Sequence, residues 1–75
     1  MRTYLKDLRN QKGYSQAKVA ELLGITPHYY TYIELGQRRK DMPYSLMVEL
    51  ANVFEVDVTY IINKERELKL MNITR

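Results

Sequence analysis

The chain has 75 residues, a net charge of +3, one histidine and no cysteine. This length suits one small domain, and the lack of cysteine excludes disulfides, thiolate zinc ligands and a thiol nucleophile. The sequence has no signal-peptide core and no membrane-spanning apolar run, which favours a cytosolic protein. A single histidine with scattered carboxylates favours a protein that is not an enzyme, and no catalytic residue, metal, cofactor or small-molecule ligand is indicated.

Two helices are predicted in the first third of the chain. The first covers residues 2–12 and ends at Gly13, which can adopt the left-handed conformation that closes a helix. Ser15 can act as the N-cap of a second helix, residues 16–23, which ends at Gly24. The apolar residues expected to face the core in these helices are Tyr4, Leu5, Leu8, Val19, Leu22 and Leu23.

Two further helices follow in the middle of the chain. Thr26 is a suitable N-cap, and Pro27 suits the first position of a helix over residues 27–35, which Gly36 ends. A basic loop then leads to a helix over residues 43–54. Its expected buried face consists of Tyr44, Met47, Val48, Leu50, Ala51 and Phe54.

The end of the chain is less clearly patterned. Asp57 can cap a short helix over residues 58–62. The segment after it fits either a helix or a strand, although no strand signal occurs before residue 67. The sequence also contains no repeat and no low-complexity segment.

The second and third predicted helices are joined by a minimal turn. Ala20 is small where two crossing helices must approach closely, and Gly24 turns the chain between them. Ile25 and Ile33 can fill the angle between the helices. Two helices connected in this way inside an all-helical domain are typical of a helix-turn-helix.

Three sequence segments resemble the Cro/phage-repressor (XRE) type of helix-turn-helix transcriptional regulator. They read LRNQKGYSQAKVAELLGIT, YIELGQRR and LANVFEVDVTYII, and the resemblance covers residues 5–62. It implies an all-α, five-helix, lambda-repressor-like domain over residues 1–62, followed by a C-terminal extension over residues 63–75. It also implies sequence-specific binding of double-stranded DNA and a role as a repressor of transcription.

The helix over residues 27–35 is expected to be the DNA-reading helix. Steps of roughly 100° per residue place Tyr30 and Ile33 on one side of it. His28, Thr31 and Tyr32 lie on the other side, which in the resembled family enters the major groove. Imidazole, hydroxyl and phenol groups can form hydrogen bonds with base edges, so these three residues are predicted to read the bases.

Basic and polar residues around this helix are expected to contact the DNA backbone. Residues 1–40 carry eight Lys/Arg against three Asp/Glu, a net charge of +5, which favours an anionic partner. Lys18 opposes the macrodipole in the first turn of its helix, which a nearby phosphate or chance can explain. The residues expected at the backbone are Ser15, Gln16, Lys18, Tyr29, Arg38, Arg39 and Lys40.

Other positions match or depart from the family pattern. The resemblance implies a structural bridge between Arg9 and Glu34. Tyr30 replaces an aliphatic residue, so its hydroxyl needs a partner or access to solvent. Glu55 stands where the family often has Gly or Asn, so a left-handed turn there would carry strain. Pro27 replaces a frequent base-reading residue, which removes one expected contact.

The C-terminal segment is a candidate for dimerisation. A domain of this size reads few base pairs, whereas a homodimer on a pseudo-palindromic operator reads twice as many. The dimer candidates are Ile61, Ile62, Leu68, Leu70, Met71 and Ile73. The alternative is that this segment folds back over its own domain.

A second class of function uses the same fold. Helix-turn-helix domains also serve as protein-interaction modules in antitoxins and coactivators, and an exposed tyrosine-rich face suits a protein interface. The dependence of binding on salt separates the two classes, because contacts with phosphates weaken steeply as salt rises.

Overall fold

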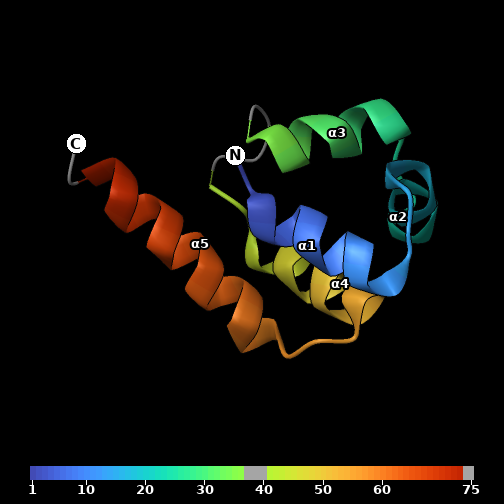
Figure 1. Ribbon diagram of the computed structural model, residues 1–75. Coiled ribbons are helices and arrows are strands. Elements are labelled where there is room, and N and C mark those ends of the chain that lie inside the picture. The colour runs from blue at the N-terminus through green and yellow to red at the C-terminus, as the bar shows by residue number, and fades with distance from the viewer. Residues whose placement is uncertain (37–40, 74–75) are drawn as a thin grey trace. The chain divides into compact units, whose positions relative to one another are not determined.

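The computed structural model describes residues 1–36 and 41–73, with side chains described as far as residue 70. Within these residues the chain is all α-helical, which confirms the predicted fold class (Figure 1). The chain divides into two compact units, Met1–Asp41 and Met42–Arg75. The helices are α1 (Thr3–Lys12), α2 (Gln16–Leu23), α3 (Pro27–Leu35), α4 (Tyr44–Phe54) and α5 (Val58–Ile73).

The boundaries of α2 and α3 follow from the capping residues between them. The Ser15 hydroxyl accepts a hydrogen bond from the backbone N–H of Lys18 at 3.0 Å. The Thr26 hydroxyl does the same for the N–H of Tyr29 at 3.2 Å. Gly24 lies between the two helices with φ of 74°, a conformation that costs glycine little because it has no Cβ. The chain can therefore turn sharply, and α2 and α3 run in different directions (Figure 1).

The core of the first unit lies where α3 meets the other two helices. α2 packs against α3, and α1 also contacts α3. Val19, Ala20, Tyr30 and Ile33 are all fully buried, as predicted for Val19, Tyr30 and Ile33. Leu22 was expected to be buried with them, but 46% of its surface is exposed. The buried side of α2 passes through Val19 and Ala20, and a residue two positions beyond Ala20 points almost the opposite way.

The second unit consists of α4 packed against α5. Leu50, Ala51 and Phe54 of α4 are buried, as predicted. Tyr44 was predicted to be buried too, but it is 62% exposed. It shares its side of the helix with Ala51, seven positions later, but it is the first residue of α4 and therefore lies at the end of the helix. Glu55 ends α4 in the left-handed conformation, with φ of 57°. The left-handed turn considered for this position is therefore present.

The fifth helix is much longer than predicted. It was expected to end at residue 62, but α5 continues to Ile73, so the segment that fitted either helix or strand is helical. This segment contains no Gly or Pro and is rich in Glu, Lys and Leu, which favour helix. Lys64 supports the helix locally, because it pairs with Glu67 at 3.9 Å and lies 5.5 Å from the ring centroid of Tyr60.

Candidate nucleic-acid interface

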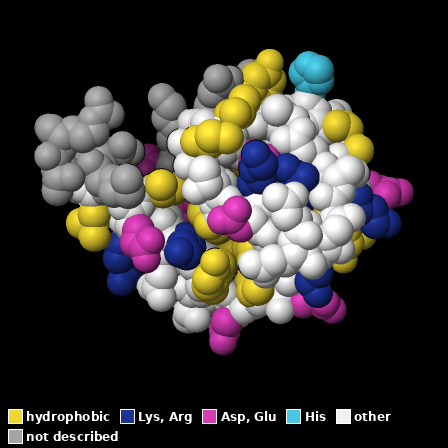
Figure 2. Space-filling view, viewed as in Figure 1, with side chains coloured by type: hydrophobic (Ala, Val, Ile, Leu, Met, Phe, Trp, Pro, Cys, Tyr) yellow, Lys and Arg dark blue, Asp and Glu magenta, His cyan; other side chains and the backbone are white. Residues whose placement is uncertain are grey.

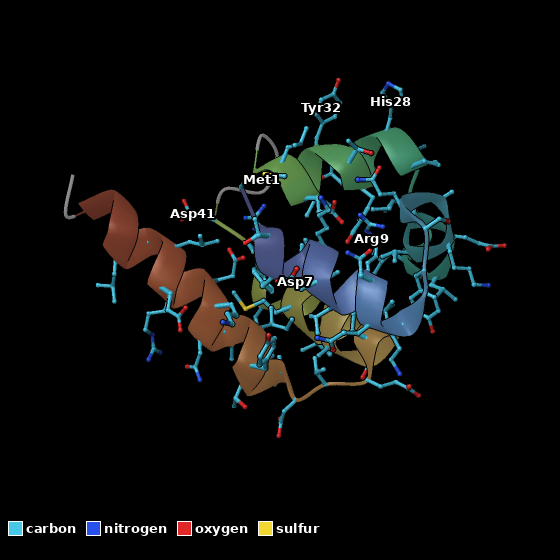
Figure 3. The ribbon with its side chains drawn as sticks, viewed as in Figure 1. Met1, Asp7, Arg9, His28, Tyr32 and Asp41 are labelled. Atoms are coloured by element: carbon cyan, nitrogen blue, oxygen red, sulfur yellow. The ribbon has the colours of Figure 1, made fainter. Side chains whose placement is uncertain are left out.

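The outer face of α3 presents two aromatic side chains one helical turn apart. His28 is exposed and Tyr32 is half-buried. Their rings meet edge to face, with centroids 6.0 Å apart and planes at 71°. Both side chains project from α3 on the side away from α1 (Figure 3), and the single histidine stands clear of the surrounding surface (Figure 2). This pair offers an imidazole and a phenol to anything that contacts α3 from outside.

The inner face of α3 holds the helix in place. Tyr30 and Ile33 are fully buried on this side. The Tyr30 hydroxyl is also buried, and no hydrogen bond to it is found within the described part of the chain. Burial, followed by the negative charge of Glu34, raises the pKa of Tyr30 above its ordinary value, so this side chain stays neutral.

Arg9 and Glu34 link α1 to α3. Arg9 extends from α1 toward α3 (Figure 3), and its guanidinium donates to both carboxylate oxygens of Glu34, from Nε at 2.8 Å and from Nη2 at 3.3 Å. Burial by itself would raise the pKa of Glu34. The hydrogen bonds from Arg9 and Gln16 outweigh that effect, so the pKa is lowered. The hydrogen bond with Glu34 also raises the pKa of Arg9. The pair is therefore ionised and fixes the spacing between the two helices.

Gln16 and Thr31 extend this pair into a longer network. The Gln16 amide Nε2 donates to Oε1 of Glu34 at 2.9 Å. The Thr31 hydroxyl lies 3.1 Å from Gln16 Oε1 and 3.0 Å from the carbonyl oxygen of Pro27, and it can donate to either. Thr31 was predicted to read bases and Gln16 to contact phosphate. The structure joins the two to each other and to Glu34, a contact that the sequence did not indicate.

The N-terminus of α2 lies beside this network. Ser15, Gln16, Arg9 and Glu34 help to line a shallow open depression of about 470 Å³. Lys18 is exposed and pairs with Glu21 on the same helix at 3.7 Å. The remaining residues predicted at the DNA backbone are half-buried Tyr29, at the start of α3, and Arg38, Arg39 and Lys40, which lie outside the described residues.

Arg2 has a role that the sequence analysis missed. It is only 3% exposed, its backbone N–H donates to the carbonyl oxygen of Glu34 at 2.8 Å, and its guanidinium Nη1 donates to that of Ile33 at 2.7 Å. These carbonyl groups belong to the last turn of α3, which carries a partial negative charge, and that of Ile33 also accepts from the N–H of Gly36 at 3.1 Å. Arg2 therefore caps the C-terminus of α3, although its sequence position gives no sign of this.

The dimer candidates differ in exposure along α5. Ile61 is fully buried, Ile62 and Leu68 are half-buried, and Leu70 is 55% exposed. The side chains of Met71 and Ile73 lie outside the described ones. The expected boundary between residues 62 and 63 falls within the continuous helix α5.

The described residues also bear on two other kinds of site. No group of three or more His, Cys, Asp or Glu side chains in that part of the chain is placed to hold a metal ion. None of the described helices is long and apolar enough to span a membrane.

The arrangement of α2, the Gly24 turn and α3 defines a helix-turn-helix. The helix-turn-helix domain family matches residues 4–67, and the chain belongs to this family. It is a domain of the transcriptional-regulator type, in agreement with the expected family and with the expectation that it is not an enzyme.

Three curated relatives carry names of this type. "Uncharacterized HTH-type transcriptional regulator YqaE" of Bacillus subtilis is 36% identical over 66 residues, which cover 88% of this chain and 55% of the relative. "HTH-type transcriptional regulator RamB" of Mycobacterium tuberculosis is 33% identical over 81% of this chain and 12% of its own length. The SPbeta prophage-derived regulator YonR of Bacillus subtilis is 34% identical over 77% of this chain and 52% of its own. The chain thus spans about half the length of two of these relatives and a small part of the other. No solved structure matches it significantly.

Proposed function

We propose that this domain binds double-stranded DNA sequence-specifically through α3 and regulates transcription, as a repressor, in the cytoplasm. The observation that carries the proposal is the pair of exposed His28 and half-buried Tyr32, in edge-to-face contact on a helix whose opposite face is anchored by buried side chains. A helix fits the major groove of B-DNA, where imidazole and phenol groups can form hydrogen bonds with base edges. Repression needs no further surface, because a bound protein can block access to the DNA it covers.

The residues around α3 supply the contacts with the backbone in this proposal. The N-terminus of α2 directs unpaired N–H groups outward beside Ser15 and Gln16, and such a helix end attracts phosphate. Lys18 lies in the same turn and is exposed. Tyr29, Arg38, Arg39 and Lys40 are assigned to the backbone on the family resemblance. These contacts position the domain on DNA, while His28 and Tyr32 distinguish the sequence.

The proposal is tested by comparing reader and anchor variants on two kinds of DNA. A specific site is first selected from random DNA. His28→Ala and Tyr32→Ala are each expected to weaken binding to that site by about 1–3 kcal/mol, and binding to random DNA much less. Lys18→Ala is expected to weaken both equally and to lower the salt slope by roughly one unit. The same holds for Arg38→Ala and Arg39→Ala.

Lys12→Ala provides a charge-matched control, because Lys12 is exposed at the end of α1, outside the helix-turn-helix and outside the proposed dimer contact. It should change neither affinity. If His28→Ala and Lys18→Ala have the same effects on both DNAs, the division into readers and anchors is wrong. If the wild-type protein binds no DNA in a salt-dependent way, the proposed function fails.

We further propose that the protein acts as a homodimer on a pseudo-palindromic operator, with the end of α5 providing the contact. The exposed Leu70 supports this, because it lies on a helix that extends eleven residues past the expected boundary at residue 62. The extension over residues 63–75 is then the dimerisation segment and residues 1–62 the DNA-binding domain.

A protein-interaction module is the second candidate. Leu22 and Leu35 are 46% and 40% exposed on α2 and α3, and exposed leucines are better suited to a protein partner than to phosphate. A partner held by these residues should remain bound as salt rises, and Leu35→Ser should weaken its binding. DNA binding that decreases steeply with salt and is unchanged in Leu35→Ser supports the DNA-binding function instead.

A further inference from the structure

Four polar side chains from three helices form one connected chain of contacts in the first unit. Arg9 of α1 donates to Glu34 of α3 at 2.8 Å. Gln16 of α2 donates to the same carboxylate at 2.9 Å. The Thr31 hydroxyl, back on α3, lies 3.1 Å from the Gln16 carbonyl oxygen. The network therefore joins the predicted base-reading helix to the first residue of the helix whose N-terminus is proposed to meet phosphate.

The ion pair dictates the direction of every hydrogen bond in this network. Glu34 is held ionised by Arg9 and can only accept hydrogen bonds. Gln16 must therefore turn its NH₂ group to Glu34, because the opposite orientation would set an amide oxygen against a carboxylate oxygen. Its carbonyl oxygen then lies at the other end of the planar amide, where a donor is required. The Thr31 hydroxyl, 3.1 Å away, can supply it, in competition with its hydrogen bond to the Pro27 carbonyl.

One N–H group of the Gln16 amide can form a further hydrogen bond. Its nitrogen carries two N–H groups, and the carboxylate of Glu34 engages one of them. Gln16 is the first residue of α2, directly after the N-cap Ser15. At this position a side-chain N–H adds to the unpaired backbone N–H groups of the first turn, all of which favour an anion.

We propose that Thr31 is a positioning residue, whose hydroxyl holds the Gln16 amide so that its second N–H meets a DNA phosphate at the start of α2. This rests on the proposed DNA-binding function and changes the role of Thr31 within it. The single hydroxyl proton of Thr31 is committed to Gln16 Oε1 or to the Pro27 carbonyl, so it is not available to a base. Thr31 thereby contributes to affinity for every DNA sequence, and the selection among sequences rests with His28 and Tyr32.

Two conservative substitutions separate the positioning role from base reading. Thr31→Val keeps the methyl group and removes the hydroxyl, whereas Thr31→Ser keeps the hydroxyl and removes the methyl. Thr31→Val is expected to weaken binding to the selected site and to random DNA alike, by about 3- to 10-fold, the usual worth of one hydrogen bond. Thr31→Ser should bind both DNAs as the wild-type protein does. In a Gln16→Ala background, Thr31→Val should have no further effect.

A second measurement tests the network in the free protein. NMR spectra should show the two side-chain N–H signals of Gln16 well separated and slow to exchange in the wild-type protein and in Thr31→Ser. In Thr31→Val they should move toward the positions of a solvated amide. Urea denaturation shows whether each variant remains folded.

The possible outcomes distinguish this inference from the proposed function. If Thr31→Val loses affinity for the selected site only, or Thr31→Ser changes the preferred sequence, Thr31 reads a base and the inference is overturned. Unchanged Gln16 signals and unchanged DNA affinity in Thr31→Val overturn it as well. A wild-type protein that binds no DNA refutes the proposed function, and the inference with it, whatever the Gln16 signals show.

Discussion

Arg2 illustrates how a single side chain can act in a way that its sequence context conceals. It was counted with the basic residues that favour an anionic partner, yet it is buried and donates to the last turn of α3. Arg9 is likewise engaged by Glu34. Part of the positive charge in the first half of the chain therefore serves internal contacts, so fewer of its basic side chains are available to an anionic partner.

Replacing Arg2 should loosen α3. Arg2→Met keeps most of the aliphatic stem but removes the guanidinium, which leaves the carbonyl of Ile33 without this donor. We expect a loss of about 1–3 kcal/mol in the free energy of unfolding, measured by urea denaturation. Lys6→Met on the exposed side of α1 is the matched control and should change little. Equal urea midpoints for the two variants would mean that Arg2 does not cap α3.

Glu34 makes stability depend on pH in a defined direction. Its pKa in the folded state lies below the ordinary value of 4.5, because hydrogen bonds from Arg9 and Gln16 outweigh the opposing effect of burial. The unfolded chain then binds a proton more readily than the folded one. The stabilisation is therefore fully present above the ordinary pKa and is lost as the pH falls below it, through the folded-state value.

This dependence can be measured with a variant that cannot titrate. Glu34→Gln should be less stable than the wild-type protein at neutral pH, and the difference should shrink as the pH decreases from about 7 to about 3. Glu21→Gln is the control, since Glu21 is exposed and pairs with Lys18 of the same helix. A stability difference for Glu34→Gln that is constant with pH would refute the role assigned to the carboxylate.

At the scale of the helices, the sequence predicted most boundaries because local chemistry sets them. Ser15 and Thr26 cap α2 and α3, and Gly24 takes the left-handed conformation between them. The end of α5 could not be predicted, because its apolar residues fit both a helix and a strand. The network of Gln16 and Thr31 could not be predicted either, since it joins residues fifteen positions apart through the crossing of two helices.

Glu55 is the one non-glycine residue with positive φ among those described, and it ends α4. A left-handed conformation costs a residue with a Cβ roughly 1–2 kcal/mol. Glycine avoids this cost, but it loses more conformational entropy on folding, so only part of the cost is recovered. Glu55→Gly should therefore stabilise the protein by about 0.5–1 kcal/mol in thermal or urea unfolding. Glu55→Ala removes the same carboxylate but retains the Cβ. If the two variants are equally stable, backbone strain at Glu55 is not significant.

At the scale of the whole molecule, specificity requires more contacts than one reading helix supplies. The few base pairs that α3 would contact under the proposed function occur by chance many times among the roughly 10⁶ or more competing sites of a genome. A two-fold dimer doubles the site, and half-site centres about 34–36 Å apart are then expected in the selected DNA. The dimer contact must come from a surface that the monomer leaves exposed, which excludes the buried Ile61 and favours the end of α5.

Leu70 provides the test of this dimer, because it is 55% exposed and its replacement should leave the monomer folded. Removing the whole tail after Asn63 would cut α5 and delete the buried Glu65, so a single substitution is the cleaner change. In Leu70→Glu, two like charges would meet across an apolar two-fold contact. We expect sedimentation to show a monomer and the affinity for the selected operator to fall steeply, with little change in binding to a single half-site. Thr59→Glu adds the same charge at an exposed position near the start of the same helix, outside residues 63–75, and should remain a dimer. If Leu70→Glu sediments as a dimer and binds the full operator like Thr59→Glu, the end of α5 is not the interface.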